Sequence, residues 1–126
     1  MTDLMCLALA IYMEARGESL VGQISVAKVI QNRMARESAT VCEVISKKNQ
    51  FPWFDNTIRT GKHKIIFKKP SFDNSLTVAE LVINDPTLKD PTNGATHFHG
   101  RAEKPSWARR LKLTLVEGGH RFYKER

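Results

Sequence analysis

The sequence predicts a single α+β domain, mostly α, with a small β-hairpin or sheet near its C-terminus. Its 126 residues suffice for one hydrophobic core, and 41% of them are hydrophobic. In the first third of the chain, apolar residues recur at the three- and four-residue spacing of helices packed on a core. Toward the C-terminus this spacing gives way to the alternation typical of half-buried strands. With no internal repeat and no low-complexity linker, residues 1–126 are expected to form one domain.

Three helices are expected in the first part of the chain. The first covers residues 3–16, where Thr2 can cap the start and Gly17 can end the helix. A second is expected over residues 19–37, and the short connection requires a hairpin or a sharp corner between the two. A short third helix is expected over residues 40–48.

The second half of the chain is expected to hold one more helix and then strands. Residues 50–70 have a mixed character, aromatic and then basic, and predict no particular element. A helix is expected over residues 74–84, started by Ser71 or Asp73 and stopped before Pro86. Alternating residues then predict strands, with a Gly-Gly turn before the last, at residues 96–99, 111–115 and 120–123.

The charge balance favours an anionic partner. The chain has 20 Lys+Arg against 13 Asp+Glu, a formal net charge of +7, which suits nucleic acid, an anionic membrane face or an acidic envelope polymer. The apolar run at residues 7–11 is far shorter than the roughly 20 residues of a membrane span. No basic residue precedes Arg16, as a secretory signal would require. We therefore expect a protein made and folded in a cytoplasm, without stable membrane insertion.

Cys6 and Cys42 are the two cysteines of the chain. They are too few for a disulfide scaffold and lack the spacing of metal ligands. Two buried thiols are the main expectation. The alternative is a single bridge, because a helical hairpin can bring both residues to the same end.

Glu14 and Glu18 are the acidic residues that break local rules. Glu14 falls in the last turn of the first helix, where the helix dipole disfavours negative charge, and beside the apolar edge of Leu7 and Ile11. Desolvation and the dipole both raise the pKa of such a carboxyl, as a general acid near neutral pH requires. The alternative is that Arg16 or another cation neutralises both acids on a solvated corner.

Aromatic residues from Phe51 onward suggest a sugar-binding cleft. Such clefts combine flat rings, which stack on pyranose faces, with amide and hydroxyl groups that orient the sugar hydroxyls. The rings of Trp53, Trp107 and Tyr123 are suited to this stacking. The alternative is that each belongs to the core, as we expect for the phenylalanines of the same segments.

Three histidines offer a weak metal pattern. His97 and His99 share one face of a predicted strand, and His120 lies farther along the chain. No paired acidic ligand accompanies them, so we expect no metal and no cofactor. Structural hydrogen bonds or substrate contacts are the expected roles of these residues.

A series of motifs runs in order along nearly the whole chain. They are Tyr12-Met-Glu-Ala-Arg-Gly-Glu18, Gly22-Gln23, Val26-Ala-Lys-Val-Ile-Gln-Asn-Arg33, Thr40-Val-Cys42, Gln50-Phe-Pro-Trp53, Gly94-Ala-Thr-His-Phe98, Pro105-Ser-Trp107 and Gly119-His-Arg-Phe-Tyr123. Together they resemble the bacterial cell-wall hydrolase family that includes the spore-cortex-lytic enzymes. That family commonly has Ser where Pro52 stands.

The resemblance implies a lysozyme-like, lytic-transglycosylase-like domain that cleaves the glycan strands of peptidoglycan. It places the catalytic acid on Glu14. Other residues match motif positions and are expected in the cleft: Glu18, Gln50, Trp53, Thr96 and Tyr123. With Trp107 and His97, they make up the expected substrate-binding set.

The reaction implied is cleavage of the β-1,4 bond between N-acetylmuramic acid and N-acetylglucosamine. A hydrolytic muramidase needs a second carboxylate, about 5–5.5 Å away for retention or about 6.5–9.5 Å for inversion. Glu18, Asp55 and Asp73 are the candidates for this second acid. A lytic transglycosylase needs none, because the sugar's own 6-hydroxyl attacks and a 1,6-anhydro end forms. The resemblance favours the transglycosylase.

A small basic catalytic domain without a signal peptide or wall-binding module also resembles a phage endolysin of Gram-negative hosts. Such an enzyme waits in the host cytoplasm until a holin opens the inner membrane, and then acts on peptidoglycan in the periplasm. We expect a monomer. A prophage-derived or cytoplasmically stored bacterial hydrolase is the alternative origin.

Two further function classes compete with this interpretation. A metal-dependent N-acetylmuramoyl-L-alanine amidase would use the histidines to cut the peptide stem. A small nucleic-acid-binding module would explain the net charge, with residues 62–69 as a phosphate-contacting patch. The chain has no helix-turn-helix, zinc-finger or RNA-binding signature, so we expect no nucleic-acid partner.

Overall fold

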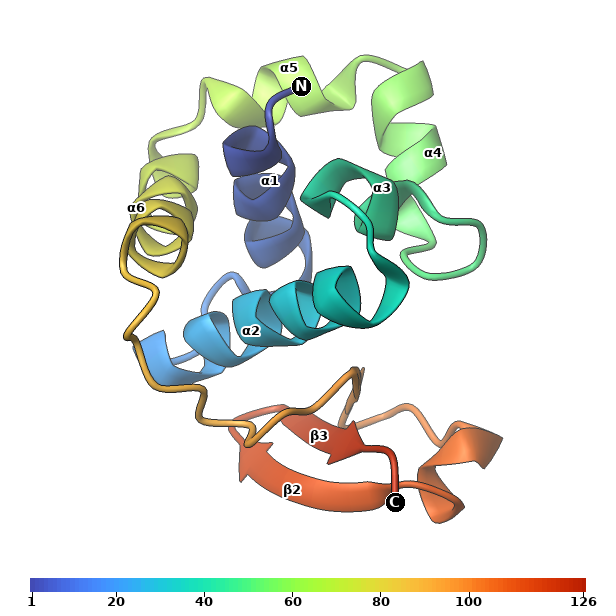
Figure 1. Cartoon of the computed structure of the whole chain (residues 1–126). Coiled ribbons are helices and arrows are strands. Elements are labelled where there is room, and N and C mark those ends of the chain that lie inside the picture. The colour runs from blue at the N-terminus through green and yellow to red at the C-terminus, as the bar shows by residue number, and fades with distance from the viewer.

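Helix α1 lies among the other helices, and a small antiparallel sheet lies beyond α2 at one end of the molecule (Figure 1). The computed structural model describes all 126 residues. None of the helices combines the length and the apolar character that crossing a membrane requires. The elements in chain order are α1 (Asp3–Ala15), α2 (Leu20–Glu37), α3 (Val41–Ser46), α4 (Trp53–Arg59), α5 (Lys62–Phe67), α6 (Pro70–Asn84), β1 (His97–Gly100), the 3₁₀-helix η1 (Ser106–Arg109), β2 (Lys112–Glu117) and β3 (His120–Lys124).

Helix α1 is the core of the helical part. Residues 6–12 are buried without interruption, so the helix is covered on all sides rather than along one stripe. The Thr2 side chain accepts a hydrogen bond from the Met5 N–H, which confirms the predicted cap. The chain then turns at Gly17, whose φ of +87° favours glycine. This turn ends α1 immediately after Glu14 and Ala15.

The predicted second and third helices are also confirmed. Ser19 caps α2 by accepting the Gly22 N–H at 3.0 Å. Thr40 and Glu43 form a reciprocal capping box at the start of α3, each side chain accepting the other's backbone N–H. These local signals explain why the sequence predicts the boundaries of these helices well.

Cys6 and Cys42 form a disulfide, so the expectation of two buried thiols is wrong. Their Cα atoms lie 5.4 Å apart, Cys6 near the start of α1 and Cys42 near the start of α3. The Asp3 carboxylate accepts the Cys42 N–H at 3.3 Å at the same place. The α1–α2 corner returns the chain so that α1 and α3 begin side by side, and sequence spacing does not reveal this.

The middle of the chain is more helical than its composition predicts. Two short helices, α4 and α5, occupy most of the region for which no element was expected, and Gly61 with φ of +75° separates them. Helix α6 begins at Pro70, several residues before the expected start. Proline suits the first turn of a helix because the N–H it lacks would have no partner there.

The C-terminal strands form one antiparallel sheet in the order β1-β3-β2. His97 pairs with Tyr123 and Phe98 with Phe122, so side chains opposite one another share a face. Phe122 is fully buried and belongs to the same hydrophobic cluster as α1 and α2. The other face of β1 and β3 carries His97, His99, Arg121 and Tyr123.

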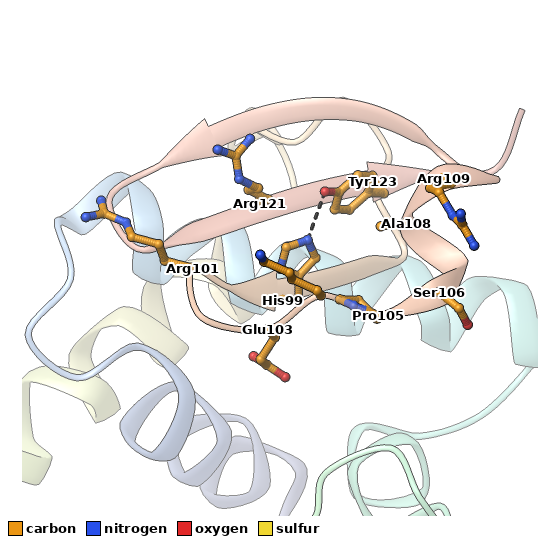
Figure 2. Close-up of a pocket in the computed structure, with 10 residues that line it drawn as sticks. His99, Arg101, Glu103, Pro105, Ser106, Ala108, Arg109, Arg121 and Tyr123 are labelled. Carbon is orange, nitrogen blue, oxygen red and sulfur yellow. Dashed lines mark hydrogen bonds between the residues drawn. The ribbon is translucent and has the colours of Figure 1, made fainter.

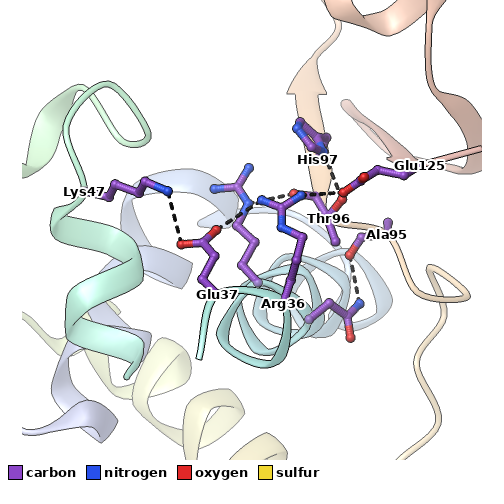
Figure 3. Close-up of polar contacts among 9 residues, drawn as sticks. Arg36, Glu37, Lys47, Ala95, Thr96, His97 and Glu125 are labelled. Carbon is purple, nitrogen blue, oxygen red and sulfur yellow. Dashed lines mark hydrogen bonds and ion pairs between the residues drawn. The ribbon is translucent and has the colours of Figure 1, made fainter. Parts of the chain in front are cut away.

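Polar contacts at the C-terminal end of α2 join the sheet to the helical part (Figure 3). Arg36 donates to Glu125, just after β3, at 2.7 Å and pairs with Glu37 at 3.1 Å. Glu37 in turn lies 3.5 Å from Lys47, which follows α3. The Arg36–Glu125 pair, together with hydrogen bonds from Asn32 and Arg33 of α2 to the Ala95 and Thr96 carbonyls before β1, joins the two parts.

Candidate active site

A cavity of about 400 Å³ lies where the end of α1, the loop before α4, strand β1 and the segment before η1 meet. Its wall combines carboxylates, two amides, two imidazoles and aromatic rings, the mixture expected of a sugar site. The residues that line it are Glu14, Arg33, Asn49, Gln50, Phe51, Pro52, His97, Phe98, His99, Glu103, Pro105 and Trp107.

Glu14 has the environment expected of a general acid. It lies half-buried in the last turn of α1, and its Oε2 accepts the indole N–H of Trp53 at 3.2 Å. Burial raises the pKa of the Glu14 carboxyl; the Trp53 hydrogen bond opposes this, Glu103 adds to it, and Arg33 lowers the pKa. Glu14 therefore keeps its proton to a higher pH than an ordinary glutamic acid.

Arg16 does not neutralise Glu14. Its guanidinium carbon lies 4.3 Å from the centroid of the Tyr12 ring, and no ion pair joins Arg16 to either acid of the motif. The alternative of two acids paired with a cation on a solvated corner is therefore not what the structure shows.

Gln50, His97 and Trp107, all expected from the sequence, line the cavity together with Glu14. The rings of His97 and Trp107 pack with centroids 5.1 Å apart. Burial lowers the pKa of His97, and the nearby Arg33 lowers it further, so the ring is held neutral near neutral pH. The site therefore offers an amide, a neutral imidazole and an indole as substrate contacts.

Trp53, Thr96 and Tyr123 stand behind or beside this wall. Trp53 binds Glu14 directly, and the Thr96 hydroxyl lies 2.9 Å from Nδ1 of His97. Tyr123 lines a neighbouring hollow, where its hydroxyl is 2.9 Å from Nε2 of His99 (Figure 2). All three residues thus contact residues of the cavity wall without lining the cavity themselves, Tyr123 through His99 and through the Trp107 ring at 5.3 Å.

Glu18 does not line the cavity, although the sequence placed it in the cleft. The break at Gly17 directs it toward the β2–β3 turn, where its Oε1 accepts the Gly119 N–H at 3.0 Å. Nδ1 of His120 lies 3.8 Å from the same oxygen, and burial lowers the pKa of that imidazole. Glu18 therefore fastens the sheet to the α1–α2 corner.

Arg33 is a cavity residue that received no role from the sequence. It is only 6% exposed, and its Nε donates to the Thr96 carbonyl at 2.6 Å. Burial lowers its pKa to about 10, so it remains charged near neutral pH, and its Nη1 is buried without a partner. The sequence offered one signal for Arg33: it is a cation within one of the family motifs, on the side of α2 that is buried.

Glu103 is the second acid in the cavity wall. Its Oε1 accepts the Gly100 N–H at 2.7 Å, which holds the otherwise exposed side chain in place. The acids considered from the sequence, Glu18, Asp55 and Asp73, are absent from this wall. An acid in an exposed loop far from Glu14 in sequence gives no signal that pattern reasoning can use.

The histidines do not converge on one point. His97 and His99 both contact Trp107, whereas His120 lies on the opposite face of the sheet against Phe98, with centroids 5.5 Å apart. No group of three His, Cys, Asp or Glu side chains is arranged to hold a metal ion.

A family model described as Cell Wall Hydrolase matches residues 17–123. The chain belongs to the cell wall hydrolase family. This match confirms the predicted enzyme class, a cell wall hydrolase. Glu14 lies just before the matched segment, so its role depends on the geometry described above.

The relatives of this cell wall hydrolase include a spore cortex-lytic enzyme and two solved catalytic domains. The spore cortex-lytic enzyme of Halalkalibacterium halodurans is 33% identical over 96 residues, which make up 76% of this chain and 26% of that protein. The chain thus spans only about a quarter (26%) of the length of this relative.

Both solved structures are catalytic domains of SleB proteins. The domain of the germination-specific lytic transglycosylase SleB from Bacillus anthracis superposes with a TM-score of 0.72 and 28% identity, covering 97% of this chain and 93% of that one. The domain of the Bacillus cereus SleB protein gives a TM-score of 0.70 and 27% identity, with 97% and 89% covered. The predicted mostly helical, lysozyme-like α+β fold is confirmed.

Proposed function

We propose that this protein cleaves the β-1,4 bond between N-acetylmuramic acid and N-acetylglucosamine in peptidoglycan, as a lytic transglycosylase without a cofactor. The observation that carries the proposal is the state of Glu14, a half-buried carboxyl with a raised pKa at the wall of a sugar-sized cavity. The likeness to a SleB domain described as a lytic transglycosylase supports the reaction type.

Glu14 performs both proton transfers in this reaction. Protonated Glu14 gives its proton to the glycosidic oxygen while the bond to the muramic acid C1 breaks through an oxocarbenium-like state. The resulting carboxylate then takes the proton of the muramic acid 6-hydroxyl, whose oxygen bonds to C1. The chain ends in a 1,6-anhydro sugar, no water is consumed, and Glu14 regains its proton.

The cavity wall supplies the contacts that hold the strand. Trp107 and His97 form a ring surface against which a pyranose face can pack, and the Gln50 amide can both donate and accept hydrogen bonds. The Trp53 indole holds the reacting carboxyl through its hydrogen bond at 3.2 Å. Holding the carboxyl in an orientation that faces the scissile bond contributes part of the rate enhancement.

A hydrolytic muramidase is the second candidate, and Glu103 is the observation that favours it. Glu103 lines the same cavity as Glu14 and is near enough to raise the pKa of Glu14. A carboxylate in this position is the group a hydrolase needs to activate water or to form a glycosyl intermediate.

Mass spectrometry of digested sacculi decides between the two reactions. An anhydro end is lighter than a reducing end by one water, so anhydro products support the transglycosylase and reducing ends alone exclude it. The Glu14→Gln variant is expected to lose about 10²–10⁴-fold in rate while folding normally. Glu80→Gln, an exposed change on α6, is the matched control. Near-normal activity of Glu14→Gln would reject the proposal.

The biological setting extends the proposal. A phage endolysin role, with the enzyme held in the host cytoplasm and released to the periplasm, fits the basic charge of +7. The Cys6–Cys42 disulfide suits action in an oxidising compartment such as the periplasm. The test is co-expression with a holin in Gram-negative cells: lysis with the native chain and none with Glu14→Gln is expected. Lysis that needs no holin would contradict cytoplasmic storage.

A further inference from the structure

A second hollow, of about 610 Å³, opens on the outer face of the sheet beside the cavity (Figure 2). Its floor is the hydrogen-bonded pair of His99 and Tyr123, and its rim is the segment between β1 and η1 with η1 itself. His99, Tyr123 and Trp107 pack against one another, with centroids 5.3–5.7 Å apart, so this floor is rigid.

The wall of this hollow carries positive charge that no ion pair in the chain neutralises. Arg101, Lys104, Arg109 and Arg121 all line it, and each is exposed. None of the four forms an ion pair, in contrast to Arg36 of α2, which pairs with two carboxylates. Apart from one hydrogen bond from Arg101 to the Gly118 carbonyl, these side chains make no hydrogen bond within the protein.

Glu103 is the single acidic residue of the hollow, and it does not offset the charge locally. Its carboxylate accepts the Gly100 N–H at 2.7 Å and points toward the helical part of the molecule, away from Arg101 and Arg121 (Figure 2). The hollow is therefore a surface of net positive charge. Guanidinium groups favour carboxylates because their parallel N–H donors match the two oxygens.

The hollow is continuous with the cavity of Glu14. His99, Glu103 and Pro105 line both, so a sugar bound beside Glu14 would lie next to the basic hollow. In peptidoglycan the substituent of the muramic acid is a short stem peptide, which carries free carboxylates. The two spaces thus match two covalently joined parts of one substrate.

We propose that the basic hollow binds the carboxylates of the stem peptide next to the bond that is cleaved. This inference rests on the proposed function, because it assumes that a glycan strand occupies the cavity. It predicts that the enzyme prefers strands that carry peptides, and that Arg101 and Arg121 supply much of this preference.

The test compares kcat/KM on glycan strands with stem peptides and on the same strands stripped by an amidase. The native enzyme is expected to favour the peptide-bearing strands, and Arg101→Gln/Arg121→Gln to reduce this ratio roughly three- to tenfold. Lys64→Gln/Lys68→Gln removes the same charge from exposed positions on or just after α5, at the far end of the molecule, and is expected to keep the native ratio. Lys104→Gln/Arg109→Gln is a second variant if the first folds poorly.

Equal rates on both strands, or an unchanged ratio in the variants, would overturn this inference and leave the proposed function intact. Failure to cleave either strand would instead reject the proposed function. In that case a titration with free stem tetrapeptide, followed by NMR at His99 and Tyr123, still tests the hollow. Shifts that are lost in Arg101→Gln/Arg121→Gln support the inference. Shifts caused only by a phosphate polymer would show a wall-polymer site and contradict it.

Discussion

The indole N–H of Trp53 donates to Oε2 of Glu14 across 3.2 Å and ties the first residue of α4 to the last turn of α1. This contact gives Trp53 a different role from the sugar-stacking one that its aromatic ring suggested. It holds the carboxyl in one orientation and stabilises its charged form against the effect of burial. Trp53 is therefore a positioning residue for the proposed acid.

Replacing Trp53 by Phe should move the alkaline fall in activity to higher pH. The hydrogen bond lowers the pKa of Glu14, so its loss raises that pKa and keeps the acid protonated over a wider range. The rate at the pH optimum should fall by roughly tenfold because the carboxyl is less well oriented. The pH profile of kcat/KM measures both effects. Trp107→Phe, which removes an indole of the same cavity but leaves this hydrogen bond, should not move the alkaline limb.

Replacing Glu103 by Gln should move the alkaline fall in activity to lower pH. The charge of Glu103 raises the pKa of Glu14, so a neutral side chain lets Glu14 lose its proton at lower pH. Anhydro products should persist if the reaction is a transglycosylation. A loss of about 10²-fold or more together with reducing-end products in the native enzyme would show that Glu103 is a second catalytic carboxylate. Glu80→Gln serves as the control for the removed charge.

Glu18→Ala should destabilise the fold by about 1–2 kcal/mol. The carboxylate accepts the Gly119 N–H at 3.0 Å and joins the corner between α1 and α2 to the hairpin turn. Urea unfolding measures the loss. Glu117→Ala is the comparison, because its hydrogen bond from Ser19 is exposed and should contribute less than about 0.5 kcal/mol. Equal losses in the two variants would contradict a fastening role for Glu18.

Cys42→Ser should lower the free energy of unfolding by roughly 2–4 kcal/mol. The disulfide joins residues separated by 36 positions and restricts the unfolded chain between them. Unfolding of the native protein with and without a reductant should show the same difference, whereas the variant should not respond to the reductant. An unchanged midpoint after complete reduction would show that the bridge does not contribute to stability.

The sequence predicted most where the decisive interactions are local. Thr2, Ser19 and Thr40 cap helices within three residues of themselves, and the expected starts were correct. Residues 53–67 were not predicted as helices, because α4 and α5 have no capping side chain and depend on packing against the core. The sequence offered the disulfide only as the alternative to two buried thiols, because it is the packing of α1 on α3 that brings its cysteines together.

The sequence alone determined the helical start of the chain and the strand alternation at its end. It also placed Glu14 in the last turn of a helix, where an acidic residue is unfavourable. These follow from spacing and from interactions within a turn, which the order of residues states directly. Only the tertiary structure decided that Trp53, Arg33 and Glu103 surround Glu14, that Glu18 turns away to the hairpin, and that basic residues gather beside the cavity. Such groupings join segments far apart in the chain, and the burial and charge that set the pKa of Glu14 exist only after those segments have packed.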